Sequence, residues 1–144
     1  MSLVSDVIAR LQAINPPVFS IVDGAIGLAT LKGVPDAVPA AYVFVKEEAS
    51  SPTERMTGPV LQRVETDLAV LIIAGNVADA QGSAVAVDLE ALKATVRGAL
   101  IGFVPEATHG EPVQHVSGQL VQFKGGYAWH EDLYSAATYL EEQS

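Results

Sequence analysis

The sequence predicts an α+β fold, in which a mixed, mainly antiparallel twisted sheet of about four to five strands is flanked by an N-terminal helix and one long amphipathic helix. Three observations lead to this prediction. Residues 60–74 alternate between polar and apolar and then turn apolar on both faces, which indicates a strand running from solvent into a core. Residues 84–101 repeat apolar side chains at helical spacing. Two β-rich runs flank Gly125-Gly126, a pair typical of hairpin turns.

The first expected helix runs from a cap at Ser2 or Ser5 to about Ile14. Its apolar residues form one stripe, at Val4, Val7, Ile8, Leu11 and Ile14. Asn15 precedes two prolines, and the residue before a proline disfavours helical geometry, so the helix should end there.

Between this helix and the long strand, the sequence predicts short elements and one long loop. Residues 18–22 favour a short strand, residues 24–31 a short helix and residues 34–39 a proline-bounded loop. Residues 40–46 are β-branched and aromatic, which predicts another strand. Residues 47–59 have the composition of a loop, and loops of this length are usually functional or disordered.

The long strand at 60–74 has one wet half and one buried half. Up to Leu68, one face is largely apolar and the other carries Arg63, Glu65 and Asp67. From Leu68 to Ala74 both faces are apolar, as in a strand that is covered on both sides.

A polar turn with capping residues at 79–83 should lead into the long helix. This helix is expected from about Ala84 to residues 101–102, and its apolar face consists of Val85, Leu89, Leu92, Val96, Leu100 and Phe103. Two last strands are expected at 113–124 and 127–140.

Composition bounds the class of protein. The 144 residues suggest a single domain over 1–144, with a net charge of −9 from 17 acidic and 8 basic residues and no cysteine. Disulfides and cysteine chemistry are therefore excluded, and the scattered cations lack the clustering that nucleic-acid binding requires. No apolar run is long enough for a membrane span, and the N-terminus does not resemble a signal peptide, so we expect a soluble intracellular protein.

The mean hydropathy of +0.30 is high for a soluble chain of this size. Either the core is generous, or apolar surface is buried against other chains.

No residue pattern specifies catalysis. His115 and His130 could face each other across the final hairpin, near Glu131 or Asp132, as a metal site or general base would require. However, these histidines and His109 lack metal-motif spacing, which favours surface positions, and adjacent strand residues point to opposite faces. Nucleophile-elbow and phosphate-loop motifs do not occur. The sequence therefore predicts no enzyme, no cofactor and no metal site.

Four segments together form a recognisable pattern: RVETDLAVLIIAGN at 63–76, a DAQG turn at 79–82, DLEALKATVRGALIGFVP at 88–105 and GQLVQFKGGYAWHEDLYSAATYL at 118–140. This pattern resembles the tail terminator (tail completion) proteins of long-tailed bacteriophages and of related tail-like particles. Phe103 stands where such proteins often have tryptophan, a departure that concerns core packing rather than role.

The resemblance implies a structural protein that forms a ring, usually a hexamer, on the head-proximal end of a tail tube. Such a ring stops tube polymerisation and offers a surface to the head–neck connector. The implied partners are further copies of the chain, the tail tube protein and the connector, with no membrane and no specific nucleic-acid binding, although DNA would pass the lumen. The implied location is the host cytoplasm during assembly and then the virion tail.

Two alternatives stay open. One is another neck or tail-completion factor, or a tail-like secretion component. The other, from a different class, is a small-molecule-binding or hydrolytic α+β domain, which would require polar residues converging in a pocket.

The expected contact surface lies in two segments. The long loop should reach a neighbouring subunit or the tube and become ordered on assembly, and the wet half of the long strand should form inter-subunit pairs or line the lumen. Plain solvent exposure is the alternative for each. The expected interface residues are Glu48, Ser51, Thr53, Arg55, Met56, Arg63, Glu65 and Asp67.

Overall fold

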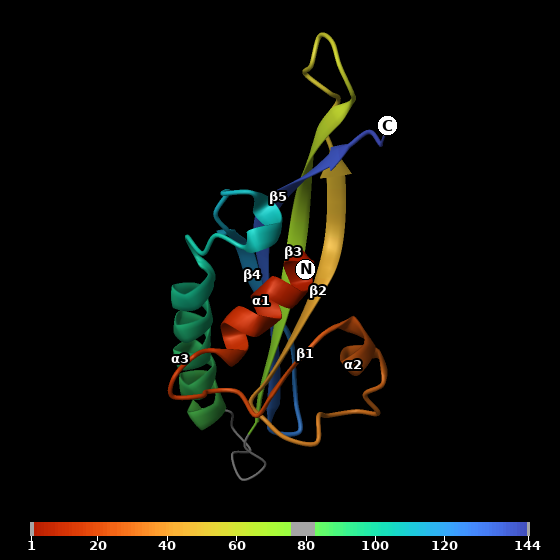
Figure 1. Ribbon diagram of the computed structural model, residues 1–144. Helices are drawn as coiled ribbons and strands as arrows, with labels where there is room; N and C mark the ends of the chain where they lie inside the picture. The colour runs from red at the N-terminus through yellow and green to blue at the C-terminus, as the bar shows by residue number, and fades with distance from the viewer. Residues whose placement is uncertain (1, 76–82, 144) are drawn as a thin grey trace.

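The computed structural model describes residues 2–75 and 83–143, and its centre is a five-stranded sheet in the order β1-β2-β3-β5-β4. The strands are β1 (Ile21–Asp23), β2 (Ala40–Ser50), β3 (Leu61–Gly75), β4 (Gln114–Lys124) and β5 (Tyr127–Glu141). The helices are α1 (Leu3–Gln12), α2 (Ala25–Ala29), α3 (Ser83–Leu100) and the 3₁₀ turn η1 (Glu106–Thr108). The helices α1 and α3 cover one face of the sheet, here called the helix face, and α2 lies at the other, the α2 face (Figure 1).

The sheet is mixed and mainly antiparallel, which confirms the predicted fold class. Strand β1 runs parallel to β2, and each of the other neighbouring pairs is antiparallel. The central strand β3 pairs with β5 along its whole length and with β2 on its other side. The polar turn predicted at residues 79–82 lies outside the described residues.

Two predicted boundaries are wrong. Residues 47–50 are not loop, because β2 continues to Ser50 and pairs Glu47 with Asp67 and Ser50 with Val64. The polar composition of this stretch resembles a loop, yet its backbone is held by the wet half of β3. The short strand predicted at 18–22 is shifted, because pairing with β2 begins only at Ile21 and runs to Asp23.

Both residues proposed as caps take part in the start of α1. The Ser5 N–H donates to Ser2 Oγ at 3.1 Å, and the Ser2 N–H donates to Ser5 Oγ at 3.0 Å, which forms a capping box. The apolar stripe of α1 buries Leu3, Val7 and Leu11 against the sheet.

The apolar face predicted for the long helix is confirmed. Val85, Leu89, Leu92, Val96 and Leu100 are all buried in the core on the helix face. Phe103 packs against the edge of this core, and the Arg10 guanidinium lies over its ring, 4.9 Å from the centroid.

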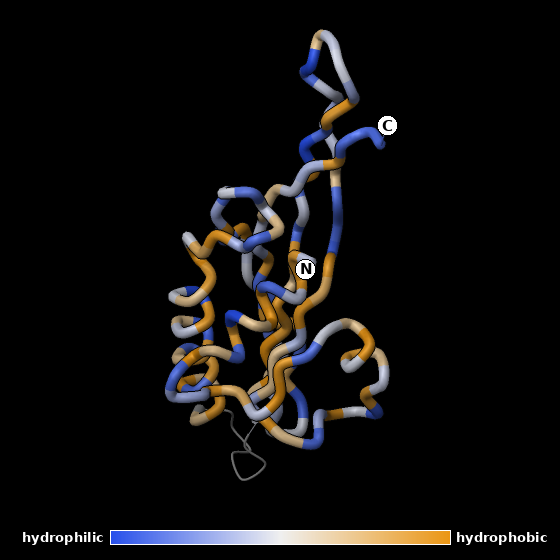
Figure 2. The backbone as a smooth tube through the Cα atoms, viewed as in Figure 1, coloured by the Kyte–Doolittle hydropathy of each residue, from blue (hydrophilic) through white to orange (hydrophobic). Residues whose placement is uncertain are grey.

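The strand β3 changes from wet to buried as predicted. Between Leu68 and Ala74 each residue is at most 7% exposed, because even-numbered side chains enter the core under α1 and α3, while Leu71 and Ile73 enter a smaller core beside α2. Figure 2 shows this difference as an apolar lower body and a mostly polar upper projection. The buried half of β3 therefore joins both cores.

The first prediction compares the same substitution at a buried and an exposed site. Leu68→Ala removes a side chain that is 1% exposed, and should lower the free energy of unfolding by about 3 kcal/mol through lost burial and a new cavity. Leu140→Ala, at 56% exposure, should change it by less than about 0.5 kcal/mol. Urea denaturation measures both, and equal losses would contradict the assignment of Leu68 to the core.

Candidate interaction site

The ends of three strands project beyond the helices and form an arm, defined here as residues 47–67 and 137–143. It contains the end of β2, the loop at 51–60, the start of β3 and the end of β5. Figure 1 shows the loop at the far tip of this projection, well away from α2 and α3. The arm includes all eight residues that the sequence predicts as interface residues.

The arm is strongly acidic. It carries seven acidic residues and two basic ones, in a chain whose net charge is −9. Glu47 lies directly opposite Asp67 in the β2–β3 register, and two like charges at such a position destabilise a strand pair. The arm therefore concentrates negative charge at one end of the molecule. In the strand pairing, no cation lies directly opposite Glu47 or Asp67 to compensate for their charges.

Arg63 is the main organising residue of the arm. Its guanidinium donates to Glu65 Oε1, with Nη2 at 2.7 Å, and to the carboxylate of Glu111 in the loop before β4. The Tyr139 hydroxyl, on the paired residue of β5, donates to the same Glu111 carboxylate at 3.1 Å. The hydrogen bond from Arg63 lowers the pKa of Glu111. These contacts join β3 and β5 to the loop that precedes β4.

The loop at 51–60 is held by hydrogen bonds within the chain. Thr53 Oγ1 accepts from the backbone N–H groups of Arg55, at 3.3 Å, and Leu61, at 3.2 Å. The Arg55 guanidinium donates to the Pro59 carbonyl and to Glu141 at the end of β5, both at 3.1 Å. These hydrogen bonds hold the loop in one conformation within the chain, and its ordering on assembly stays a prediction.

Seven of the eight predicted interface residues divide into two groups, and the eighth, Asp67, lies opposite Glu47 in the strand pairing. Ser51, Thr53, Arg55, Arg63 and Glu65 make contacts that shape the arm, and Ser51 donates its N–H to the Arg63 carbonyl at 2.9 Å. Met56 is 97% exposed at the tip, and Glu48 is exposed on β2. A shallow groove lies between the loop and β5, lined by Ser51, Pro52, Glu54, Arg55, Leu61, Arg63 and Tyr139. Met56 and Glu48 are therefore accessible on the surface of the arm.

A second polar cluster lies beneath α3 and centres on the buried carboxylate of Asp132. Arg97 of α3 donates to both oxygens, from Nε at 3.0 Å and from Nη2 at 2.9 Å. The Tyr134 hydroxyl donates to Oδ2 at 3.0 Å, and His130 Nε2 lies 2.8 Å from Oδ1. Burial by itself raises the pKa of Asp132, but the hydrogen bonds from Arg97, His130 and Tyr134 outweigh it and lower the pKa to about 2.

The expectation that the histidines lie on the surface is wrong for His130, whose side chain is 5% exposed. His130, Asp132 and Tyr134 are each two residues apart in β5, so they point to the same face, and this spacing is the signal that the sequence offers. His115 joins them from β4, with its Nε2 3.4 Å from Asp132 Oδ1. No comparable spacing in the sequence places Arg97 in this cluster, because Arg97 belongs to α3 and not to β5.

Gly118 of β4 makes room for this cluster. A Cβ atom at Gly118 would lie 2.5 Å from Asp132 Oδ1 and 2.9 Å from Arg97 Nη2, closer than atoms can approach. Because the Asp132 side chain is fully buried and its oxygens accept from three partners, the cluster fastens α3 to the sheet rather than presenting a reactive group to solvent.

No three His, Cys, Asp or Glu side chains gather as metal ligands within residues 2–75 and 83–143. Over the same ranges, none of the helices has the length and apolar character needed to cross a membrane.

The Asp132 cluster gives a pH prediction. Because the folded pKa of about 2 lies below the ordinary value of 3.8, the stabilisation is complete above pH 4 and is lost as the pH falls from about 4 to 2. This change should amount to about 2 kcal/mol. The Asp132→Asn variant should lack this loss of stability between about pH 4 and 2, as measured by urea unfolding across that range. An identical acid slope in the variant and the wild type would contradict the assignment.

Two glycines allow a matched test of the crowding at Gly118. Gly118→Ala should destabilise the chain by about 1–3 kcal/mol, because the new methyl group meets Asp132 and Arg97. Gly98→Ala in α3, where no atom lies within 4 Å of the added Cβ, should be neutral or stabilising by up to about 1 kcal/mol. Thermal unfolding of both variants measures these changes in stability. If Gly118→Ala does not lower the stability, the cluster is loosely packed.

Comparison with known proteins agrees with the pattern in the sequence. A comparison with curated proteins gives no match to the chain. The family model of the phage tail terminator protein matches residues 2–144, which is essentially the whole chain and includes the arm, the sheet and the three helices. The chain therefore belongs to the phage tail terminator family, and its role lies in phage tail assembly as a component that interacts with tail proteins.

Proposed function

We propose that the chain is a non-enzymatic structural protein that forms a ring on the head-proximal end of a tail tube. The ring stops further tube polymerisation and provides the surface to which the head–neck connector binds. Family membership over residues 2–144 supports the tail role, and the arm is the single structural observation that favours capping through a projecting contact surface.

The arm has the properties of a contact surface that is formed in advance. Its loop is fixed by Thr53 and Arg55, so little conformational entropy is lost when a partner binds. Its tip exposes Met56, an adaptable apolar side chain, amid acidic residues. A tube end or connector with a basic, partly apolar surface would complement it, and the opposed carboxylates of Glu47 and Asp67 would gain a cation.

The same electrostatics suit a channel for DNA. The net charge of −9 and the scattered cations give a surface that repels phosphates, so the duplex could pass the lumen without being bound. In the buried cluster described above, both oxygens of Asp132 accept hydrogen bonds from within the chain, which supports a structural role rather than catalysis.

The role of the arm in capping is tested by replacing residues 52–59 with a short Gly-Ser turn in the phage or tail-like particle whose genome encodes the chain. We expect tails of uncontrolled length and unattached heads in negative-stain electron microscopy, because the cap no longer engages the tube. An unchanged thermal melt of the variant shows that the body is folded. Val87→Ser, at an exposed site of α3 far from the arm, is the control and should give normal particles. Normal tail length and head attachment with the replaced loop would contradict the proposal.

A further inference from the structure

The two ends of the sheet are formed by different strands, β4 at one end and β1 at the other (Figure 1). Among the described residues β4 pairs with β5 alone, and β1 pairs with β2 alone. Unpaired backbone N–H and C=O groups along such edges are a template for another strand. Each chain therefore offers two free edges that differ in sequence.

The strand registers place β1 level with one part of β4. Three rows of paired residues cross the whole sheet, and each begins on β4 and ends on β1. Gln119 is level with Asp23, Leu120 with Val22, and Gln122 with Ile21. Rotation about an axis along the strands keeps each residue at its own height, so the same rows meet when a second copy stands beside the first.

The strand directions also suit a contact between these edges. β1 runs parallel to β2, and the direction then reverses at each step through β3, β5 and β4. β4 of one copy would therefore run antiparallel to β1 of a copy related to it by such a rotation.

Apolar side chains lie at both edges on the helix face. Leu120 and Phe123 are opposite His130 and Ala128, which point beneath α3, and directly opposed residues carry their side chains on the same face. The two β4 side chains are 58% and 42% exposed. Val22, in the same row as Leu120, is half-buried and packs at the edge of the helix-face core. On this face, apolar surface of one copy would cover apolar surface of the next.

The other face of β4 is polar and carries no negative charge. Gln122 and Lys124 are opposite Trp129 and Tyr127, which pack against the smaller core beside α2. Their side chains therefore lie on the α2 face. β4 has no acidic residue along its whole length.

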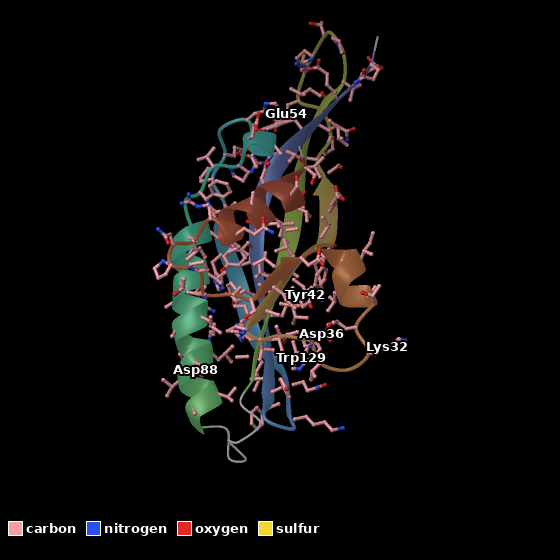
Figure 3. The ribbon with its side chains drawn as sticks, turned by 60° about the horizontal axis from the view of Figure 1, so that its bottom comes forward. Lys32, Asp36, Tyr42, Glu54, Asp88 and Trp129 are labelled. Atoms are coloured by element: carbon pink, nitrogen blue, oxygen red, sulfur yellow. The ribbon has the colours of Figure 1, made fainter. Side chains whose placement is uncertain are left out.

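The β1 end of the α2 face is acidic. Burial, followed by the carboxylates of Asp23 and Asp36, raises the pKa of Tyr42, so both carboxylates lie near this residue. Asp23 is exposed and directly opposite Tyr42 in the β1–β2 pairing. In Figure 3 Asp36 and Tyr42 lie on the same side of the molecule, as does Lys32, the one cation within residues 20–39. The two edges are therefore complementary in charge on the α2 face.

We infer that copies of this chain join through β4 of one copy and β1 of the next, paired antiparallel. This inference rests on the ring proposed above and names its subunit contact. Leu120 would pack beside Val22 on the helix face, and Gln119 would stand beside Asp23 on the α2 face. Because the two surfaces differ, the contact is heterologous and repeats around an axis. The β-bulge between Leu120 and Gln122 increases the twist of β4 at these rows, which turns each copy relative to its neighbour, as a closed ring requires.

Cysteine pairing tests this contact directly, because the chain has no cysteine of its own. The purified variants Gln119→Cys and Asp23→Cys, which alter two residues of one row, are mixed, allowed to assemble and oxidised. Intact mass spectrometry should show mainly the mixed disulfide dimer, because adjacent strands lie about 4.8 Å apart, within the reach of a disulfide.

Glu48→Cys is the matched control for Asp23→Cys, because it also removes one exposed carboxylate from this end of the sheet. Glu48 pairs with Thr66, five positions along β3 from the Leu71 of the Asp23 row, which is about 17 Å. It should give no mixed dimer with Gln119→Cys. A dominant Gln119→Cys homodimer would show two-fold pairing of β4 with β4, and a dominant Glu48→Cys mixed dimer would show a shifted contact. Either result, or the absence of every dimer, overturns the inference.

A charge variant separates this inference from the proposed function. Leu120→Lys should raise the concentration needed for half assembly by about tenfold or more in analytical ultracentrifugation, because the new charge would be buried against Val22. Val87→Lys, at an exposed site of α3, should leave it unchanged. A wild-type chain that forms rings which Leu120→Lys does not weaken would overturn the β4–β1 contact and leave the capping role intact. A wild-type chain that stays monomeric would overturn the contact as stated, whereas the tail-length assay tests capping independently.

Discussion

The structure depends on the burial of one half of β3 on both faces. Residues 68–74 of this strand lie between the core under α1 and α3 and the smaller core beside α2, while β2 and β5 satisfy their backbone groups on either side. A strand buried in this way cannot slip by one residue, because every side chain would exchange one core for the other. The register of β2 and β5 is fixed by the same constraint, and β1 and β4 are added to strands that are already placed.

The arm is the continuation of those fixed strands beyond their cores. From Glu65 towards the loop, the side chains of β3 become polar, and hydrogen bonds around Arg63 and Thr53 replace apolar packing as the stabilising contacts. Because these hydrogen bonds and the strand pairing hold its base, the arm presents an acidic surface beyond the body of the fold. Membership of the phage tail terminator family gives that surface a context, since a tail component must contact tail proteins through some exposed part of its fold.

Much of the fold follows from local patterns in the sequence, whereas contacts between distant residues do not. The period of α3, the wet and buried halves of β3 and the cap at Ser2 and Ser5 are all local, and all are confirmed. The extension of β2 to Ser50 depends on pairing with β3, which composition does not reveal. The arm segments are predicted, but the partner of Arg63 is Glu111, 48 residues away. In the Asp132 cluster, the sequence suggests that His115 and His130 lie near Asp132, but it does not reveal Arg97, which reaches the cluster from another element.

We propose that this chain closes the head-proximal end of a tail tube as a ring. Cryo-electron microscopy of that end, in particles assembled with the wild-type chain, tests it most directly. We expect a closed ring of copies of this fold at the junction, with the arms in contact with a neighbouring protein. A junction that lacks this fold, or copies of it scattered along the tube instead of forming a terminal ring, would contradict it.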